Sequence, residues 1–196
     1  MQILLLGPQG SGKGTQAKRI AAEYGLPHVA TGDIIRAIKE EETPLGREVK
    51  AVYDRGDLVS DDLMIRLIRE RLSHDDASQG FILDGFPRTL AQAEALDELL
   101  RELHRELDVV FEFQVDDEQT LLERMHKRAH EEGRSDDTPE AIARRLELYR
   151  RETAPLVEHY RTRRGNVVGL HAHRSVNQVF AELQETLERL QNEAVA

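Results

Sequence analysis

The stretch that decides the fold is Ile-Leu-Leu-Leu-Gly-Pro-Gln-Gly-Ser-Gly-Lys-Gly-Thr at residues 3–15. An apolar run of strand length leads directly into a glycine-rich turn, and a helical pattern follows from Gln16. Glycines let such a turn point successive backbone N–H groups at phosphate oxygens, and the N-terminus of the helix adds partial positive charge. The pattern predicts a loop that binds a nucleoside triphosphate. The alternative is a glycine-rich turn that holds no ligand.

Two side chains of this loop carry predicted roles. Lys13 is expected to reach the β- and γ-phosphates, and the Thr15 hydroxyl to meet a phosphate or the hydration shell of Mg²⁺. The general pattern G-x-x-x-x-G-K-[ST] has Ser or Thr at the place of Gly14, so the hydroxyl comes one residue late. The residues expected to contact the triphosphate are Gly10, Ser11, Gly12, Lys13, Gly14 and Thr15.

The composition excludes several classes of protein. A formal net charge of −10 over 196 residues argues against general affinity for nucleic acid or an anionic membrane, although local arginines can still hold a phosphate. The chain has no cysteine, which excludes disulfides and thiolate zinc sites. The apolar run at residues 1–6 is too short for a signal peptide or a membrane span. A cytoplasmic location is therefore expected.

Apolar runs recur at residues 3–6, 28–30, 81–83, 109–115 and 167–170, and stretches with helical periodicity separate them. Such runs are typical of strands buried on both faces of a parallel sheet. The alternation predicts an α/β fold of three layers around a five-stranded parallel sheet. Residues 31–59 hold two short helical patterns separated by residues 43–46. Residues 129–137 lack an apolar face, so a mobile surface loop is expected there.

Four blocks of the sequence resemble those of nucleoside monophosphate kinases, most closely the adenylate kinases with a short lid. They are Lys-Gly-Thr at 13–15, Thr-Gly-Asp-Ile-Ile-Arg at 31–36, Leu-Asp-Gly-Phe-Pro-Arg-Thr at 83–89, and Gly-Arg-Ser-Asp-Asp at 133–137 followed by Arg144 and Arg145. The resemblance implies one P-loop NTPase-type domain over residues 1–196, with an acceptor-nucleotide subdomain at 31–59, a short lid at 129–137 and no structural zinc. The implied reaction is Mg·ATP + AMP ⇌ 2 ADP, catalysed by a monomer.

The resemblance assigns the acceptor nucleotide to a second group of residues. Arg36 and Arg88 would clamp its α-phosphate, since a planar guanidinium binds phosphate bidentately. In the resembled family, the residues at the places of Thr31 and Gln92 favour adenine as the acceptor base. The full set expected around the acceptor base is Thr31, Leu58, Val59, Gly85 and Gln92.

Each acceptor assignment has a structural alternative. Thr31 can be a helix N-cap, and residues 89–92 form a capping-box pattern that would occupy Gln92. Leu58 and Val59 can be ordinary packing residues, and a single surface arginine is usually only solvated.

Asp84 ends an apolar run, so its carboxylate is expected at the carboxyl edge of the sheet beside the phosphate loop. An anion at that place suits Mg²⁺ held through water, because Mg²⁺ keeps much of its hydration in proteins. The alternative is an aspartate that opens a turn before Gly85.

Arginines near the lid are predicted to supply the positive charge that phosphoryl transfer needs. Arg124 and Arg128 lie four residues apart on one helical face, and the resemblance makes Arg124 the residue that stacks on the donor adenine. Arg134 in the loop and Arg145 on the next helix would contact the acceptor as well. The predicted catalytic set is Lys13, Arg88, Arg124, Arg128, Arg134 and Arg145. The alternative is a solvated, charged helix face.

Two neighbouring features complete the predicted site. Asp136 and Asp137 are expected to pair with the lid arginines. Arg174 lies in the loop at residues 170–175, which in the resembled family contacts the donor base, and we expect it at the ATP site together with Arg124 and Arg128. The loop departs from the family pattern at Arg174, which leaves the choice between ATP and GTP open.

Two other functions remain open from the sequence. One is a kinase of the same fold that uses UMP or CMP as acceptor, and the other is a P-loop switch or regulatory ATPase with a protein partner. The two arginine-bearing motifs expected to bind a second small molecule favour a kinase over a switch. The expected partners are ATP, AMP and ADP, with neither nucleic acid nor membrane among them.

Overall fold

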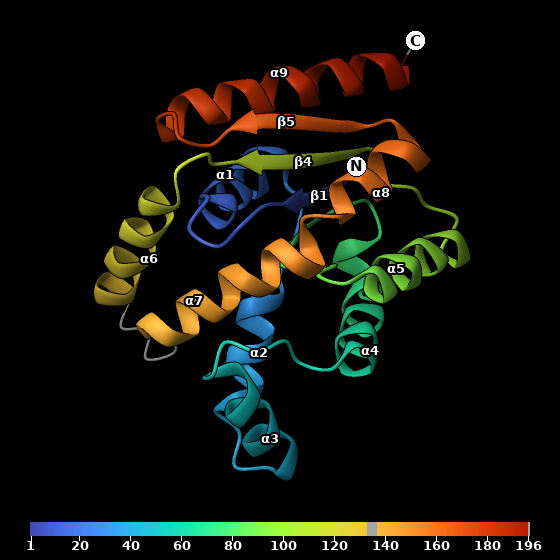
Figure 1. Ribbon diagram of the computed structural model, residues 1–196. Helices are drawn as coiled ribbons and strands as arrows, with labels where there is room; N and C mark the ends of the chain where they lie inside the picture. Colours follow the sequence, from blue (N-terminus) through green and yellow to red (C-terminus); the bar gives the residue numbers. More distant parts are fainter. Residues whose placement is uncertain (133–136, 196) are drawn as a thin grey trace.

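The computed structural model describes residues 1–132 and 137–195. One parallel sheet lies at its centre, with the strand order β2-β3-β1-β4-β5 (Figure 1). Each predicted strand is present, with its ends within one residue of the apolar run that predicted it. The strands are β1 (Gln2–Leu6), β2 (His28–Ala30), β3 (Phe81–Asp84), β4 (Val109–Gln114) and β5 (Val167–His171).

Burial on both faces explains the continuous apolar runs. In β1, Ile3, Leu4, Leu5 and Leu6 are all at most 2% exposed. Side chains alternate along a strand, so Ile3 and Leu5 pack into the core on one side of the sheet, and Leu4 and Leu6 into the core on the other. The predicted three-layer α/β fold is therefore confirmed.

Helices cover both faces of the sheet. On one face, α1 (Lys13–Tyr24) and α9 (Val176–Val195) bury apolar stripes that include Ile20 and Leu183. The other face is covered by α4 (Asp61–Leu72), α5 (Leu90–Glu102) and α8 (Leu156–Arg164), and a short 3₁₀ turn (Asp75–Ala77) precedes β3. Among the described residues, no helix combines the length and hydropathy that a membrane crossing requires.

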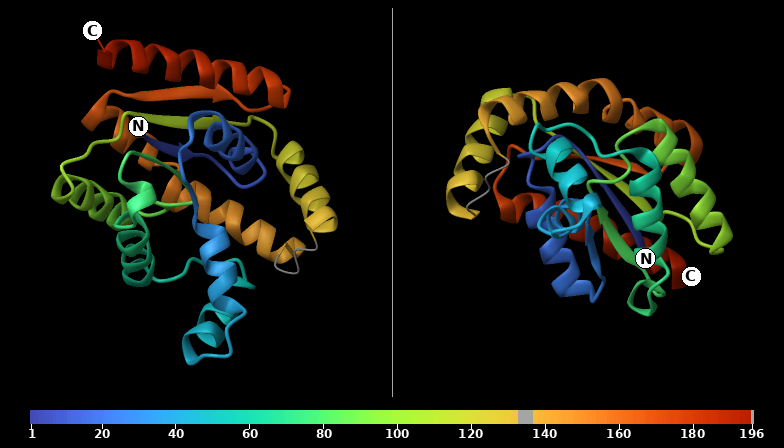
Figure 2. Two further views of the ribbon diagram at one scale, coloured as in Figure 1. Left: turned by 180° about the vertical axis from the view of Figure 1, so that it is seen from behind. Right: turned by 90° about the horizontal axis from the view of Figure 1, so that it is seen from below.

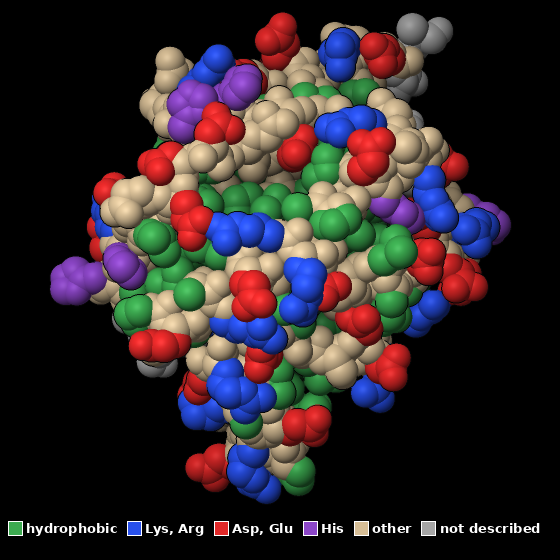
Figure 3. Space-filling view, viewed as in Figure 1, with side chains coloured by type: hydrophobic (Ala, Val, Ile, Leu, Met, Phe, Trp, Pro, Cys, Tyr) green, Lys and Arg blue, Asp and Glu red, His purple; other side chains and the backbone are tan. Residues whose placement is uncertain are grey.

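The helices α2 (Thr31–Lys39) and α3 (Pro44–Tyr53) form an arm that projects away from the sheet (Figures 1 and 2). The two predicted helical patterns are therefore present. Residues 43–46 do not separate the helices but begin the second one, because the Gly46 N–H donates to Thr43 Oγ1 at 2.9 Å and Pro44 occupies the first turn. On the face shown in Figure 3, acidic and basic side chains are interspersed over this arm.

Two further helices follow β4 in the chain. They are α6 (Glu118–Glu132) and α7 (Pro139–Leu148), and a π-helical turn at Tyr149–Thr153 leads from α7 toward α8. The loop expected over residues 129–137 is shorter than predicted, because α6 continues to its end at Glu132. Ala129 and Glu131 are good helix formers, and a polar helix needs no apolar face where it meets solvent. Residues 133–136 lie outside the described part of the chain.

The packing of α9 on the sheet generates a stability prediction. Leu183 is 0% exposed in the core, whereas Leu90 is 52% exposed. We expect Leu183→Ala to lower the free energy of unfolding by about 2–5 kcal/mol, because it removes buried surface and leaves a cavity. Leu90→Ala is the matched control and should change it by less than about 0.5 kcal/mol. Urea denaturation measures both, and equal losses would contradict this packing.

Candidate active site

The phosphate loop lies at the carboxyl end of β1, between Leu6 and the first residue of α1, Lys13. The Lys13 ammonium donates to the carbonyl oxygens of Gly7 at 2.6 Å and Pro8 at 2.8 Å. Burial lowers the pKa of Lys13 to about 8, and the charge of Asp84 acts in the opposite direction. The loop therefore holds a largely desolvated cation beside the backbone N–H groups of the first turn of α1.

Asp84 lies where the sequence predicted, at the end of β3 beside the phosphate loop. Sheet register pairs it with Leu5 of β1, and its Oδ2 lies 3.3 Å from His28 Nε2. Burial alone would raise the pKa of Asp84, but the hydrogen bond from His28 and the charge of Lys13 outweigh it and hold the pKa below its usual value. The carboxylate is therefore ionised at neutral pH.

The loop opens onto the main cavity, which has a volume of about 970 Å³ and extends from the phosphate loop to α6, α7 and the start of α9. Among the described residues, its lining carries nine Lys or Arg side chains against three Asp or Glu. The cavity therefore attracts anions although the chain as a whole carries −10. The basic side chains are Lys13, Lys18, Arg36, Arg88, Arg124, Lys127, Arg128, Arg145 and Arg174.

The residues predicted to bind the donor nucleotide all line this cavity. Arg124 of α6 donates to the carbonyl oxygen of Ala172 at 2.8 Å and so ties α6 to the loop before α9. Arg128, one turn later, donates to Asp137 at 2.6 Å. Arg174 lies at the rim and is paired with Glu182 of α9.

A small pocket, with a volume of about 30 Å³, adjoins the main cavity on the side of the arm. It brings together all of the residues predicted around the acceptor base, which are Thr31, Leu58, Val59, Gly85 and Gln92. Gly85 has a φ of 86°, and a Cβ there would lie 2.5 Å from Thr31 Oγ1, so only glycine fits. The two cavities share Arg88 and Tyr53 in their linings.

The sequence offered structural roles for Thr31 as a helix N-cap and for Gln92 in a capping box, and the structure treats the two differently. Thr31 is not the N-cap of α2, because Ala30 holds that place and the Thr31 hydroxyl donates to the Asp84 carbonyl oxygen at 3.2 Å. Only half of the predicted capping box of α5 is confirmed, because the Gln92 N–H donates to Thr89 Oγ1 at 3.2 Å but no bond joins the Thr89 N–H to the Gln92 side chain among the described hydrogen bonds. Gln92 also accepts from the Arg88 N–H and donates to Asp61 Oδ1. Its amide is thus held in one orientation at the edge of the small pocket.

The two arginines predicted to clamp the acceptor phosphate both face the main cavity. Arg88 Nε donates to the Gly85 carbonyl oxygen at 2.7 Å. Arg36 Nη1 donates to the Tyr53 hydroxyl at 3.0 Å, and its other end pairs with Asp33. Burial lowers the pKa of Arg88 from its usual range, and the neighbouring charges of Arg145 and Arg36 act in the same direction.

The expected pairing between lid carboxylates and arginines is confirmed for Asp137. Its side chain is 0% exposed and accepts from Arg128 of α6 and from Arg145 of α7, the latter at 2.6 Å. One buried carboxylate thus links the two helices that flank residues 133–136. The predictions for Arg134 and Asp136 lie outside the described residues.

Sequence reasoning missed several residues that line the main cavity. Tyr53 lies in an amphipathic helix and carries no motif, and His28 is a lone histidine in a short strand. Tyr149 and Thr153 belong to the π-helical turn, where the sequence carries no motif. The Thr153 hydroxyl donates to the Arg88 carbonyl oxygen at 2.8 Å. Burial and the charge of Glu112 raise the pKa of Tyr149 to about 12.

Comparison with known proteins decides the family. The adenylate kinase family profile matches residues 5–165. The adenylate kinase of Cyanothece sp. is 44% identical over 194 residues, which cover 99% of this chain and 98% of that protein. The adenylate kinase of Thermobifida fusca is 51% identical over 163 residues, 83% of this chain and 86% of that protein.

The chain belongs to the adenylate kinase family. The adenylate kinase of Maricaulis maris, 47% identical over 188 residues that cover 96% of this chain and 99% of that protein, agrees with this assignment. Family membership confirms the resemblance inferred from the four sequence blocks, and with it the prediction that the chain is a phosphotransferase of the adenylate kinase type. Gly14, which departs from the general phosphate-loop pattern, is no obstacle to this assignment.

The lowered pKa of Lys13 gives the adenylate kinase site a testable pH dependence. Below pH 8 Lys13 is already protonated in the empty site, so its titration should make triphosphate affinity no more than weakly dependent on pH in this range. Above pH 8 the amine must take up a proton on binding, and affinity should fall by up to about tenfold per pH unit. Calorimetric titration with a non-hydrolysable ATP analogue at pH 7, 8 and 9 measures this.

The control for this titration is Lys13→Met, which should bind more weakly and lose the pH dependence. Equal affinity of the unmodified chain at pH 7 and pH 9, with no proton uptake, would contradict the assigned state of Lys13.

Proposed function

We propose that this chain transfers the terminal phosphoryl group of Mg·ATP to AMP and produces two ADP. The single observation that carries the proposal is the continuity of the two cavities. The phosphate loop opens into the main cavity, and Gly85 and Arg88 line both this cavity and the small pocket. A triphosphate on the loop and a monophosphate in the small pocket would therefore have their phosphates in one shared, cationic space.

The donor half is assigned to the phosphate loop and to α6. Residues 10–15 would hold the triphosphate, with Lys13 on its β- and γ-phosphates. Arg124 would stack on the donor base and Arg128 would contact the phosphates, since both point into the main cavity from one helix face. Arg174 would lie near the donor base from the opposite wall.

The acceptor half is assigned to the arm and to the loop after β3. Arg36 and Arg88 would bind the α-phosphate, and both face the main cavity close to the small pocket. The acceptor base would enter the small pocket, which Thr31, Leu58, Val59, Gly85 and Gln92 line. No described contact favours UMP or CMP over AMP, and the family assignment favours AMP.

The protein would catalyse the transfer by positioning both substrates and by placing positive charge around the transferred phosphoryl group. In an in-line transfer the charge spreads over the transferred phosphoryl group, so cations placed in a dry site lower the barrier without a covalent intermediate. Lys13, Arg88, Arg124, Arg128 and Arg145 surround the main cavity and are assigned this role, with Arg134 proposed from the sequence alone. Closure of residues 129–137 and of the arm at residues 31–59 over the substrates would exclude water, the competing acceptor.

The residues present fit a Mg²⁺ ion that arrives with the triphosphate. Asp84 offers an ionised oxygen donor beside the phosphate loop, with a side chain 15% exposed, and its hydrogen bond from His28 engages Oδ2. Among the described residues, no group of three metal-binding side chains forms a separate site. Mg²⁺ would neutralise and orient the phosphates, and Asp84 would hold it through water.

We also propose that the chain acts as a cytoplasmic monomer with ATP, AMP and ADP as its partners. Every residue assigned here belongs to one chain, which supports a site formed within a monomer. Its substrates are nucleotides of the cell interior.

The proposed reaction is tested directly by ADP formation from ATP or GTP with AMP, CMP, UMP or GMP as acceptor. We expect turnover with ATP and AMP to exceed that with every other pair. Preference for UMP or CMP would favour the pyrimidine alternative. Tight ATP binding without turnover on any monophosphate would overturn the kinase proposal and favour a switch or ATPase.

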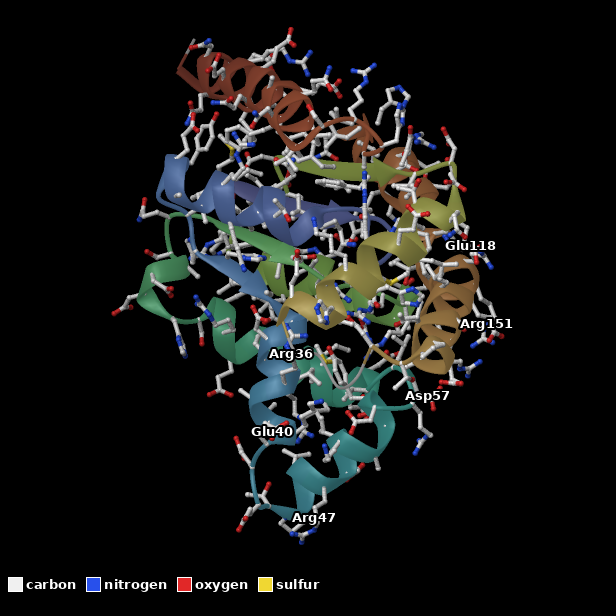
Figure 4. The ribbon with its side chains drawn as sticks, turned by 90° about the vertical axis from the view of Figure 1, so that its left-hand side faces the viewer. Arg36, Glu40, Arg47, Asp57, Glu118 and Arg151 are labelled. Atoms are coloured by element: carbon white, nitrogen blue, oxygen red, sulfur yellow. The ribbon has the colours of Figure 1, made fainter. Side chains whose placement is uncertain are left out.

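The division into donor and acceptor halves predicts an asymmetric effect of Arg88→Ala. We expect kcat/KM for AMP to fall by at least about 100-fold, because the site loses a buried phosphate ligand, while the Kd for ATP changes less than about threefold. Arg47→Ala is the matched control, since Arg47 lies toward the far end of the arm (Figure 4) and is exposed. Equal losses in ATP and AMP binding would contradict the assignment.

A further inference from the structure

Tyr53, the last residue of α3, lies among three cations, two from α2 and one from α7. Its hydroxyl accepts from Arg36 Nη1 of α2 at 3.0 Å. The Arg145 guanidinium of α7 lies 4.9 Å from the ring centroid, and its Nη2 donates to the Tyr53 carbonyl oxygen at 3.2 Å. The ammonium of Lys39 lies 5.3 Å from the same ring. One side chain, 8% exposed, thus contacts a cation through each of its polar and aromatic surfaces.

The backbone that follows Tyr53 is anchored on α7, which fixes the side chain relative to Arg145. Asp57 Oδ1 accepts from Arg144 Nε at 2.9 Å, and Figure 4 shows Asp57 where the arm meets α7. Gly56 has a φ of 79°, and a Cβ there would lie 2.5 Å from the Ala141 carbonyl oxygen. The turn after α3 therefore packs against α7 backbone to backbone.

Tyrosine is chemically suited to hold cations that must remain available to a substrate. Arg36 already pairs with Asp33, and a second carboxylate at the place of Tyr53 would offset its charge further and compete with an incoming phosphate. A neutral hydroxyl accepts one N–H bond from Arg36 without adding negative charge, and an aromatic face attracts Arg145 by its quadrupole. Tyr53 also lines both the main cavity and the small pocket, so both contacts lie at the junction where the acceptor phosphate is placed.

We propose that Tyr53 is a positioning residue of the acceptor half: its hydroxyl aligns Arg36, and its ring and carbonyl oxygen align Arg145, toward the acceptor phosphate. This inference rests on the proposed phosphoryl transfer to AMP and deepens it. It predicts that the two surfaces of the side chain act separately. The hydroxyl serves acceptor binding through Arg36, and the ring serves transfer through Arg145.

Two substitutions separate these contributions. Tyr53→Phe removes only the hydroxyl, and we expect KM for AMP to rise about 3- to 10-fold, with kcat changed less than about twofold and KM for ATP unchanged. Tyr53→Leu removes the ring as well, and we expect the same rise in KM together with a fall in kcat of about tenfold. Tyr24→Phe, which removes a hydroxyl at the far end of α1, is the matched control and should leave all three values unchanged.

A double-mutant cycle tests whether the hydroxyl acts through Arg36. In an Arg36→Ala background, Tyr53→Phe should raise KM for AMP no further, because the group that it positions is gone. Additive effects, an unchanged KM in Tyr53→Phe, or equal changes in KM for ATP and AMP would each overturn the inference. If thermal denaturation shows that Tyr53→Leu does not fold, Tyr53→Phe and the double-mutant cycle still test the inference. Absence of AMP turnover in the unmodified chain would instead refute the proposed function.

Discussion

The cations of the main cavity repel one another, and much of the polar structure around them serves to hold them together. Two unit charges about 5 Å apart repel by roughly 3 kcal/mol at an effective dielectric constant of about 20. Burial is the main cause of the lowered pKa of Lys13, about 8, and the charges of Arg88 and Arg128 lower it further. The compensating groups are placed between the cations: Asp84 faces the phosphate loop, and the buried Asp137 accepts from both Arg128 and Arg145. The site can therefore be strongly cationic within an acidic chain.

These compensating groups also connect parts of the fold that the backbone leaves separate. Asp137 joins α6 to α7, Tyr53 joins the arm to α7, and the bond from Arg124 to the Ala172 carbonyl oxygen joins α6 to the loop before α9. Each link ends on a cation that faces the main cavity. In the proposed reaction, an incoming phosphate would compete for the same guanidinium groups, and substrate binding would then be coupled to the arrangement of α6, α7 and the arm through these contacts.

The sequence predicted what depends on local pattern and left out what depends on packing between distant elements. The strand, loop and helix around Lys13 were predictable because glycine placement and apolar run are both local. The position of Asp84 followed from the common edge of a parallel sheet. The burial of Asp137 between two helices and the contacts of Tyr53 were not predictable, because they depend on how α7 meets α6 and the arm. The Gln92 side chain is held by Arg88 and Asp61 and also lines the small pocket, and the sequence alone could not separate a structural role from a binding one.

The central claim is that donor and acceptor share one connected cavity. Its most direct test is calorimetric titration with a dinucleotide in which five phosphates join two adenosines. We predict that one molecule binds per chain, more tightly than ATP or AMP alone, and that it excludes both. Two molecules bound per chain, or a complex that still takes up AMP with unchanged affinity, would contradict the claim.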